Sequence, residues 1–257
     1  MRCPNNNLPF LILLSILSLS CTGRLALHAS EGFAAARFVP ERKDDFAFEN
    51  DKVAFRIYGP ALKDSTENSG IDCWLKRVDY PIIDKWYRQE AIEGKSYHKD
   101  HGEGFDPYHV GESLGCGGLA LWIEGQMRLS NVYQSHRILK NGPDVTVFEV
   151  EYLWEDLPRE TREIRRFTLA AGSQLFKAES QFFIEGKPKQ VEVAIGVSTH
   201  DGQALAYSDP QNGWIAAWEN MKGSGLGTGV ALSPDQEAKV LTIESAAKDQ
   251  GHIIFIT

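Results

Sequence analysis

Residues 146–152 read TVFEVEY and residues 162–169 read REIRRFTL, and these two runs decide the fold class. Apolar and polar side chains alternate along both runs, which is the period of a β-strand with one buried face. The same reasoning predicts strands at 52–58, 119–123, 127–129, 175–184, 190–197, 213–218, 229–232, 240–245 and 252–256. Consecutive strands without intervening helices predict an all-β chain, built as a large antiparallel β-sandwich.

The strand pattern predicts one β-sandwich domain over residues 38–257. No long segment has helical periodicity, and one short helical turn is expected near residues 84–93. Residues 70–110 are expected to form an irregular insertion. The chain ends on residues 252–257 (HIIFIT), which resemble the middle of a core strand rather than a solvated tail. We therefore expect the domain to be incomplete at its carboxyl end.

The amino terminus has the pattern of an export signal. Residues 8–19 form an apolar run that is too short to span a bilayer as a stable anchor. Two processing outcomes stay open, because residues 18–21 (SLSC) resemble a lipoprotein box and residues 27–29 (LHA) offer a cleavage site. The sequence predicts a signal peptide over residues 1–29 and a periplasmic, outer-membrane-anchored or secreted protein. A lipid on Cys21 is the only membrane attachment expected.

Charge and composition narrow the range of partners. The formal net charge is −8 and no basic run exists, which argues against nucleic acid as the main partner. Net charge does not determine the charge of one pocket, so a basic site for an acidic sugar stays open. Cys73 and Cys116 remain in the mature chain, either as a disulfide or as buried thiols.

Residues 97–109 (YHKDHGEGFDPYH) hold an unusual density of titratable side chains. Gly102, Gly104 and Pro107 interrupt regular structure, so a loop is predicted. Loops on a rigid scaffold often carry binding and catalytic groups, and we expect a functional site here. The catalytic candidates in the loop are Tyr97, His98, His101, Tyr108 and His109.

One reaction that these residues could support is β-elimination of a uronate glycoside. It needs a base for the C5 proton, an acid for the leaving oxygen and a cation for the carboxylate. His101 and Tyr108 are the expected base and acid, and Arg137 is the expected cation. Arg56 and Lys99 are alternative partners for the carboxylate.

Two other reactions stay open. Glycoside hydrolysis needs two carboxylates, and Asp100, Glu103 and Asp106 lie near one another in the sequence. A mutarotase or epimerase needs one acid and one base across a sugar ring, for which His109 or His200 with Glu103 would serve.

A metal site is the fourth option. His98 and His101 with Asp100 or Asp106 could ligate calcium or zinc. The spacing matches no strong template, and no C-x-x-C pair is present, so no cofactor is predicted.

Aromatic side chains could add a sugar-binding surface. Trp74, Trp86 and Trp122 would either stack on pyranose rings or, for at least two of them, pack in the core. The expected substrate-binding residues are Arg56, Trp74, Lys99, Asp100, Glu103, Asp106, Arg137 and His200. The glycine-rich run at 114–118 lacks the lysine of a phosphate loop and is expected to be close backbone packing or a bulge.

Five motifs stand out, namely 45–51 (DFAFEND), 55–60 (FRIYGP), 70–76 (GIDCWLK), 97–111 and 114–118 (LGCGG). These motifs resemble a family of exported bacterial proteins, domain of unknown function 4861. The resemblance spans residues 38–232 and implies a sandwich of the galactose-mutarotase type. Members tend to accompany polysaccharide-degrading enzymes, so the resemblance also implies work on uronic-acid-containing polysaccharide or oligosaccharide. It implies a lyase, a glycosidase or a sugar mutarotase or epimerase, and a non-catalytic glycan-binding module is the alternative.

Overall fold

The computed structural model describes residues 32–257, so the predicted export signal at 1–29 and Cys21 lie outside the described residues. Strands make up 50% of the chain and helices 6%, and the sheets are antiparallel. The predicted all-β class is therefore confirmed. Residues 32–257 form a single compact unit.

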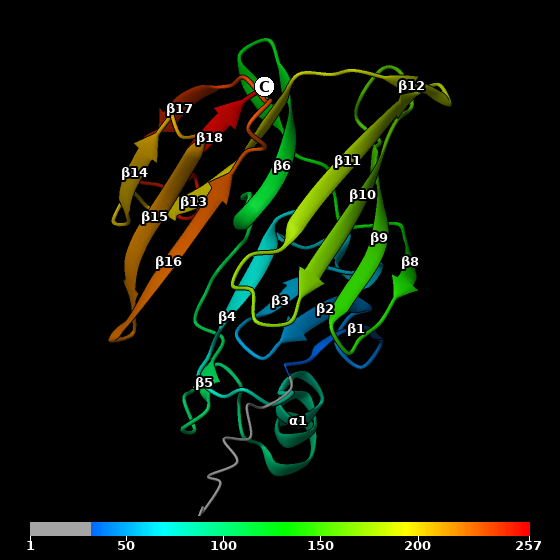
Figure 1. Cartoon of the computed structure of the whole chain (residues 1–257). Coiled ribbons are helices and arrows are strands. Elements are labelled where there is room, and N and C mark those ends of the chain that lie inside the picture. The colour runs from blue at the N-terminus through cyan, green and yellow to red at the C-terminus, as the bar shows by residue number, and fades with distance from the viewer. Residues whose placement is uncertain (1–31) are drawn as a thin grey trace, which may run out of the picture. The chain divides into compact units, whose positions relative to one another are not determined.

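Two five-stranded sheets face each other and form the first half of the fold (Figure 1). Rings from both sheets meet in the core between them, and the centroids of Phe46 and Phe148 lie 4.5 Å apart. One sheet has the order β1-β2-β3-β4-β5, from β1 (Ala34–Val39), β2 (Asp45–Asn50), β3 (Ala54–Ile57), β4 (Ile71–Lys76) and β5 (Gly104–Phe105). The other has the order β12-β11-β10-β9-β8, from β8 (Ser135–Lys140), β9 (Val145–Trp154), β10 (Thr161–Ala170), β11 (Lys177–Ile184) and β12 (Lys187–Lys189).

A five-stranded and a three-stranded sheet form the second half. The larger has the order β17-β18-β13-β6-β7, from β6 (Cys116–Ile123), β7 (Gln126–Arg128), β13 (Val193–His200), β17 (Lys239–Ile243) and β18 (Gly251–Ile256). The smaller has the order β14-β15-β16, from β14 (Leu205–Asp209), β15 (Trp214–Met221) and β16 (Ser224–Ala231). Val197, Ile215 and Phe255 belong to the apolar cluster between these two sheets.

Helical structure is confined to one place beside the first sheet and one short turn. Helix α1 (Ile83–Arg88) continues into a single π-helical turn at Gln89–Glu93, which confirms the turn predicted near 84–93. A 3-10 turn covers Pro60–Leu62. No helix within residues 32–257 is long and apolar enough to cross a membrane.

The glycines at 114–118 allow two sheets to approach closely. A side chain at Gly115 would begin 2.1 Å from the carbonyl oxygen of Ile71 on β4, so no larger residue fits. Gly117 has φ +111° at the point where the register of β6 shifts against β13. The expected close packing and bulge are both confirmed.

The strongly alternating runs are confirmed as strands, but the irregular insertion predicted at 70–110 was partly wrong. Residues 71–76 (IDCWLK) form β4, a strand in the first sheet. Alternation failed there because Ile71, Asp72, Cys73 and Trp74 are all buried. A strand covered on both faces carries no period of two.

Candidate functional site

A large cleft lies between the two halves of the fold. Residues of β3, β4, β11 and β12 from the first half and of β6 and β16 from the second half line it, and Figure 1 shows where these strands lie. Its volume is about 1690 Å³, large enough for several sugar rings. We refer to this hollow as the β11–β16 cleft.

The lining of the β11–β16 cleft combines a buried apolar part with exposed polar side chains. The buried part includes Phe55, Cys73, Cys116, Leu119 and Leu226. The exposed polar part holds amide and charged side chains, namely Lys52, Gln174, Lys177, Glu179, Gln181, Lys189, Gln190, Asp235 and Gln236. Such a mixture of apolar surface and a few polar groups is typical of small-molecule sites.

Trp218 on β15 borders the cleft with a half-exposed ring. Its ring lies against β16 at two glycines, and a side chain at Gly225 would begin 2.5 Å from Cζ2 of the indole. A second hollow of about 520 Å³ is lined by Tyr207 and Ala216 and shares Trp218, Gly227 and Thr228 with the cleft. The indole of Trp218, a residue that is 52% exposed, therefore borders both hollows.

Sequence reasoning placed the aromatic surface elsewhere. Trp74 and Trp86 stack on each other in the core with ring centroids 5.6 Å apart, which is the packing expected for at least two of the three tryptophans. Trp74 is 4% exposed, although it also belongs to the lining of the β11–β16 cleft. Trp122 packs against a buried cluster. The signal for Trp218 is the sequence GLGTG at 225–229, where every second residue of a strand lacks a side chain.

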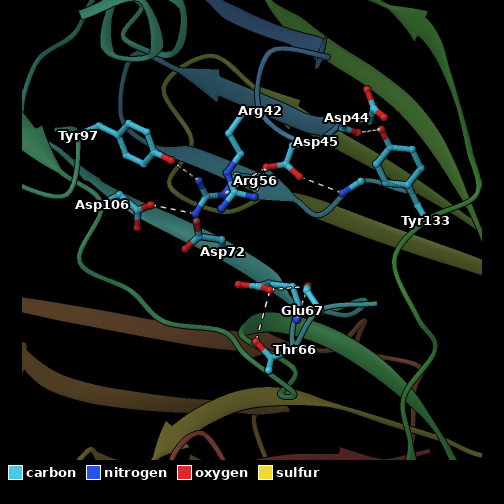
Figure 2. A network of polar contacts seen from close by, with 12 residues as sticks. Arg42, Asp44, Asp45, Arg56, Thr66, Glu67, Asp72, Tyr97, Asp106 and Tyr133 are labelled. Carbon is cyan, nitrogen blue, oxygen red and sulfur yellow. Dashed lines mark hydrogen bonds and ion pairs between the residues drawn. The ribbon is translucent and has the colours of Figure 1, made fainter. Parts of the chain in front are cut away.

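The inner residues of the 97–109 loop join a buried ion network beneath the first sheet (Figure 2). Arg56 binds the carboxylates of Asp72 and Asp106 through Nη2 at 2.6 and 2.9 Å, and it donates through Nη1 to the hydroxyl of Tyr97 at 3.3 Å. Its side chain is 3% exposed. Arg56, Tyr97 and Asp106 are buried, line neither of the two hollows and fasten the loop to the sheet, so the structure gives no support to the substrate roles expected for them.

Burial controls the protonation of this network. Desolvation raises the pKa of Asp106, with a further increase from the neighbouring carboxylate of Asp72. Desolvation also raises the pKa of Asp45 to about 6, although Arg42 and Arg56 oppose it. Low dielectric disfavours the charged carboxylates, and the two arginines hold them in place.

The exposed residues of the loop bind mostly to the loop itself and to its neighbours. His98 Nδ1 and His101 Nε2 bond to the backbone carbonyls of Asp106 and Ser96, each at 3.1 Å. Lys99 is exposed, and Asp100 pairs with Arg77. These contacts hold the side chains of His98, His101 and Asp100 against the loop and its neighbours.

Two further expected residues are held in ion pairs. Burial disfavours ionisation of Glu103, yet hydrogen bonds from Lys85, Tyr80 and Trp86 lower its pKa to about 2. Arg137 lies on β8 and binds Glu149 at 2.6 Å. The structure therefore does not bring Arg137 together with His101 and Tyr108, the set expected for β-elimination.

Three of the expected residues do meet, in a histidine cluster beside the end of β13. His109 Nδ1 lies 2.8 Å from Asp249 Oδ2, and His200 Nε2 lies 2.8 Å from the backbone oxygen of His109. His200 Nδ1 bonds to Glu219 at 2.9 Å, and the buried ring of Tyr108 packs edge-on against His200. Glu219 and Asp249 were missed because they lie on β15 and in the segment before β18, far away in the sequence.

The histidine cluster combines strain, charge and access to solvent. His200 has φ +52°, a conformation that costs energy for a residue other than glycine. Burial disfavours the charged imidazole of His200, but Glu219 outweighs it and raises the pKa. His109 is 47% exposed, and Lys248 Nζ lies 3.0 Å from its Nε2. A histidine oriented by a carboxylate is the arrangement of a general base.

The family of the chain follows from comparison with known proteins. Residues 25–257 match a family described as domain of unknown function, DUF4861. The chain belongs to the DUF4861 family. The resemblance predicted from motifs between residues 38 and 232 is thereby confirmed.

One curated relative of this DUF4861 chain comes from Formosa agariphila and is described as uncharacterized protein P7. The two are 36% identical over 197 residues, which is 73% of this chain and 49% of the relative. The chain thus spans about half the length of that relative. No solved structure matches the chain.

Within residues 32–257 of the DUF4861 chain, no group of three or more His, Cys, Asp or Glu side chains is arranged to hold a metal ion. His98 and His101, which a metal site would have used as ligands, bond to backbone carbonyls.

Proposed function

We propose that this protein binds an acidic oligosaccharide or polysaccharide in the β11–β16 cleft. The observation that carries the proposal is Trp218, whose half-exposed ring lies flat over glycines where two hollows meet. Aromatic faces pack well against the apolar face of a pyranose ring. A chain of sugars lying across Trp218 would occupy both hollows at once.

The polar side chains of the cleft support a carbohydrate ligand. Gln174, Gln181 and Gln190 each offer an amide that can donate and accept hydrogen bonds, which suits sugar hydroxyls. Hydroxyls have the same dual character, so several weak contacts can add up along a sugar chain. This is the pattern by which a small number of polar groups fixes the orientation of a ligand in an otherwise apolar site.

The cations of the cleft support an acidic ligand. Lys52 and Lys177 are exposed and pair with Asp51 at 3.3 Å and Glu179 at 2.7 Å. Lys189 is exposed as well, and no acidic side chain within residues 32–257 pairs with it. On a chain of net charge −8, an available lysine beside a sugar-sized hollow favours a uronate over a neutral sugar.

We further propose that the protein is exported and meets its ligand in the periplasm, at the outer membrane or outside the cell. The signal pattern of residues 1–29 supports this, with Cys21 as the attachment point of any lipid anchor. Polysaccharides with uronic acids are met outside the cytoplasm, so export and ligand class agree.

Calorimetric titration with oligogalacturonate and with neutral galacto-oligosaccharides tests the binding proposal. We expect Trp218→Ala to weaken binding of oligogalacturonate about tenfold, because the stacking surface is lost. Trp214→Ala is the matched control, since Trp214 is exposed on the same sheet and lines neither hollow. Equal affinities of Trp218→Ala and the unchanged protein, or no binding of either glycan, would contradict the proposal.

The histidine cluster favours a second candidate function, acid–base catalysis on the same class of glycan by a lyase or a glycosidase. Asp249 orients His109 for proton transfer, and Lys248 places a cation beside its Nε2. In β-elimination His109 Nε2 takes the C5 proton, the C4–C5 double bond forms as the C4–O bond breaks, and the leaving oxygen takes a proton from water. Lys248 Nζ would move from Nε2 to the substrate carboxylate, which frees Nε2 to act as the base and makes C5 more acidic.

Product analysis with uronate oligosaccharides tests catalysis. Elimination produces an unsaturated uronate that absorbs in the ultraviolet, whereas hydrolysis releases reducing ends without that absorbance. We expect His109→Gln to abolish turnover, because it removes the proton-accepting nitrogen. His101→Gln is the matched control and should keep turnover, since His101 lies outside the cluster. Binding without any product would leave glycan binding as the sole function.

A further inference from the structure

Arg165 on β10 is a buried arginine in the lining of the β11–β16 cleft, and one of its donors has no partner within residues 32–257. Arg165 binds Glu163 through Nε at 2.6 Å and through Nη2 at 2.8 Å. Its side chain is 1% exposed, and its residue belongs to the cleft lining. Nη1 has no hydrogen-bond partner among the described residues.

A buried donor without a hydrogen-bond partner destabilises the folded protein. Native proteins therefore retain few such groups. A ligand atom that accepted a hydrogen bond from Nη1 would remove that cost on binding. The free energy recovered would appear as affinity.

The neighbours of Arg165 hold Nη1 in a fixed position. Glu163 accepts two hydrogen bonds from one edge of the guanidinium. Glu163 also accepts a hydrogen bond from Ser180, the residue opposite Arg165 on β11. The ring of Tyr152 supports the guanidinium face, with the central carbon 4.7 Å from the ring centroid. A donor held this firmly loses little entropy when it binds a ligand.

Charge determines which ligand group suits Arg165. Glu163 is fully buried and already balances the charge of Arg165. A second carboxylate would have to lose its water beside Glu163, whereas a neutral oxygen needs no such desolvation of charge. A single unpartnered donor, Nη1, also matches a single acceptor oxygen.

We infer that Nη1 of Arg165 hydrogen-bonds a sugar hydroxyl at the inner end of the cleft. The inference rests on the proposed glycan binding and gives the ligand an orientation. The hydroxyl edge of the ring faces Arg165, and the carboxylates face the exposed lysines, Lys189 foremost. Arg165 then contributes affinity for sugars in general, and Lys189 contributes the preference for acidic ones.

Calorimetry with oligogalacturonate and neutral galacto-oligosaccharides separates these contributions. Arg165→Lys keeps a cation beside Glu163 but removes Nη1, and we expect it to weaken binding of both probes by a similar factor, about three- to tenfold. Lys189→Met should weaken binding of the acidic probe alone. Arg166→Lys is the matched control, because Arg166 is the next residue and binds Glu149 outside the cleft.

The possible outcomes distinguish this inference from the proposed function. If Arg165→Lys binds both probes as the unchanged protein does, or loses only the acidic probe, the inference is overturned while Trp218→Ala still decides glycan binding. If the unchanged protein binds neither probe, both proposals fall. Should Arg165→Lys fail to fold by circular dichroism, Glu163→Gln decides instead. That variant frees the charge of Arg165, and we expect it to shift preference toward the acidic probe, whereas an unchanged preference would contradict the inference.

Discussion

At the scale of single residues, Arg56 shows why residue type alone misled the prediction of the site. The sequence offers an arginine near a loop rich in histidine and aspartate, which is also what a uronate site requires. The structure uses those aspartates to neutralise Arg56 inside the protein. An arginine pairs equally well with a carboxylate of the chain and with a carboxylate of a ligand. Only the burial of the arginine in the structure shows which of the two it serves.

Substitution of Arg56 separates the structural role from a binding role. We expect Arg56→Ala to lower the free energy of unfolding by about 3–5 kcal/mol, because Asp72 and Asp106 would stay buried without their cation. Arg137→Ala is the matched control and should cost less than about 1 kcal/mol, since the Arg137 side chain is 70% exposed and Glu149 keeps its ion pair with Arg166. Chemical denaturation measures both. Equal and small losses would contradict the assignment of Arg56 to the fold.

At the scale of elements, alternation predicted those strands that expose one face. Strands β9 and β10 follow the runs at 146–152 and 162–169 closely, whereas β13 begins and ends three residues after the run at 190–197. Strand β4 was missed because its first four residues are all buried, and the short β14 was not predicted at all. Alternation of polar and apolar residues reveals a strand that has one face in water. It is lost when both faces of the strand are buried.

The pairing of β15 with β16 explains how Trp218 obtains its flat position. Gly227 lies directly opposite Trp218, and Gly225 and Gly227 contact the indole. We expect Gly225→Val to push the ring away from β16 and to weaken glycan binding about as much as Trp218→Ala does. Gly223→Val is unsuitable as a control because Gly223 has φ +85°, so Gly186→Asn, at a turn outside the cleft, serves instead.

Calorimetry and circular dichroism measure the effect of Gly225→Val. The variant should keep its fold, because Gly225 is exposed on β16 and has an ordinary φ. Unchanged affinity for oligogalacturonate in a folded Gly225→Val protein would contradict the role given to the flat ring.

At the scale of the whole molecule, the β11–β16 cleft exists because strands from different sheets pack beside one another. The β11–β16 cleft is lined by segments near residues 52–55, 116–119, 174–191 and 225–236, which are far apart in the sequence. The histidine cluster likewise joins His109, Glu219 and Asp249 from three separate segments. Sequence reasoning could identify the all-β class and the family motifs, but it could not show which distant strands would share a cavity.

The membership of the DUF4861 family places these observations in a wider group without fixing a reaction. The curated relative is about twice as long as the region that it shares with this chain. Within residues 32–257, the cleft and the histidine cluster are separate features, and the two proposed functions can be tested independently.

The most direct test of the central claim is a crystal structure of the protein with bound oligogalacturonate. We expect one sugar ring to lie parallel to the indole of Trp218, with the chain continuing into the β11–β16 cleft and a carboxylate near Lys189. Sugar density over the loop at 97–109 with none at Trp218, or no density at saturating ligand, would contradict the account.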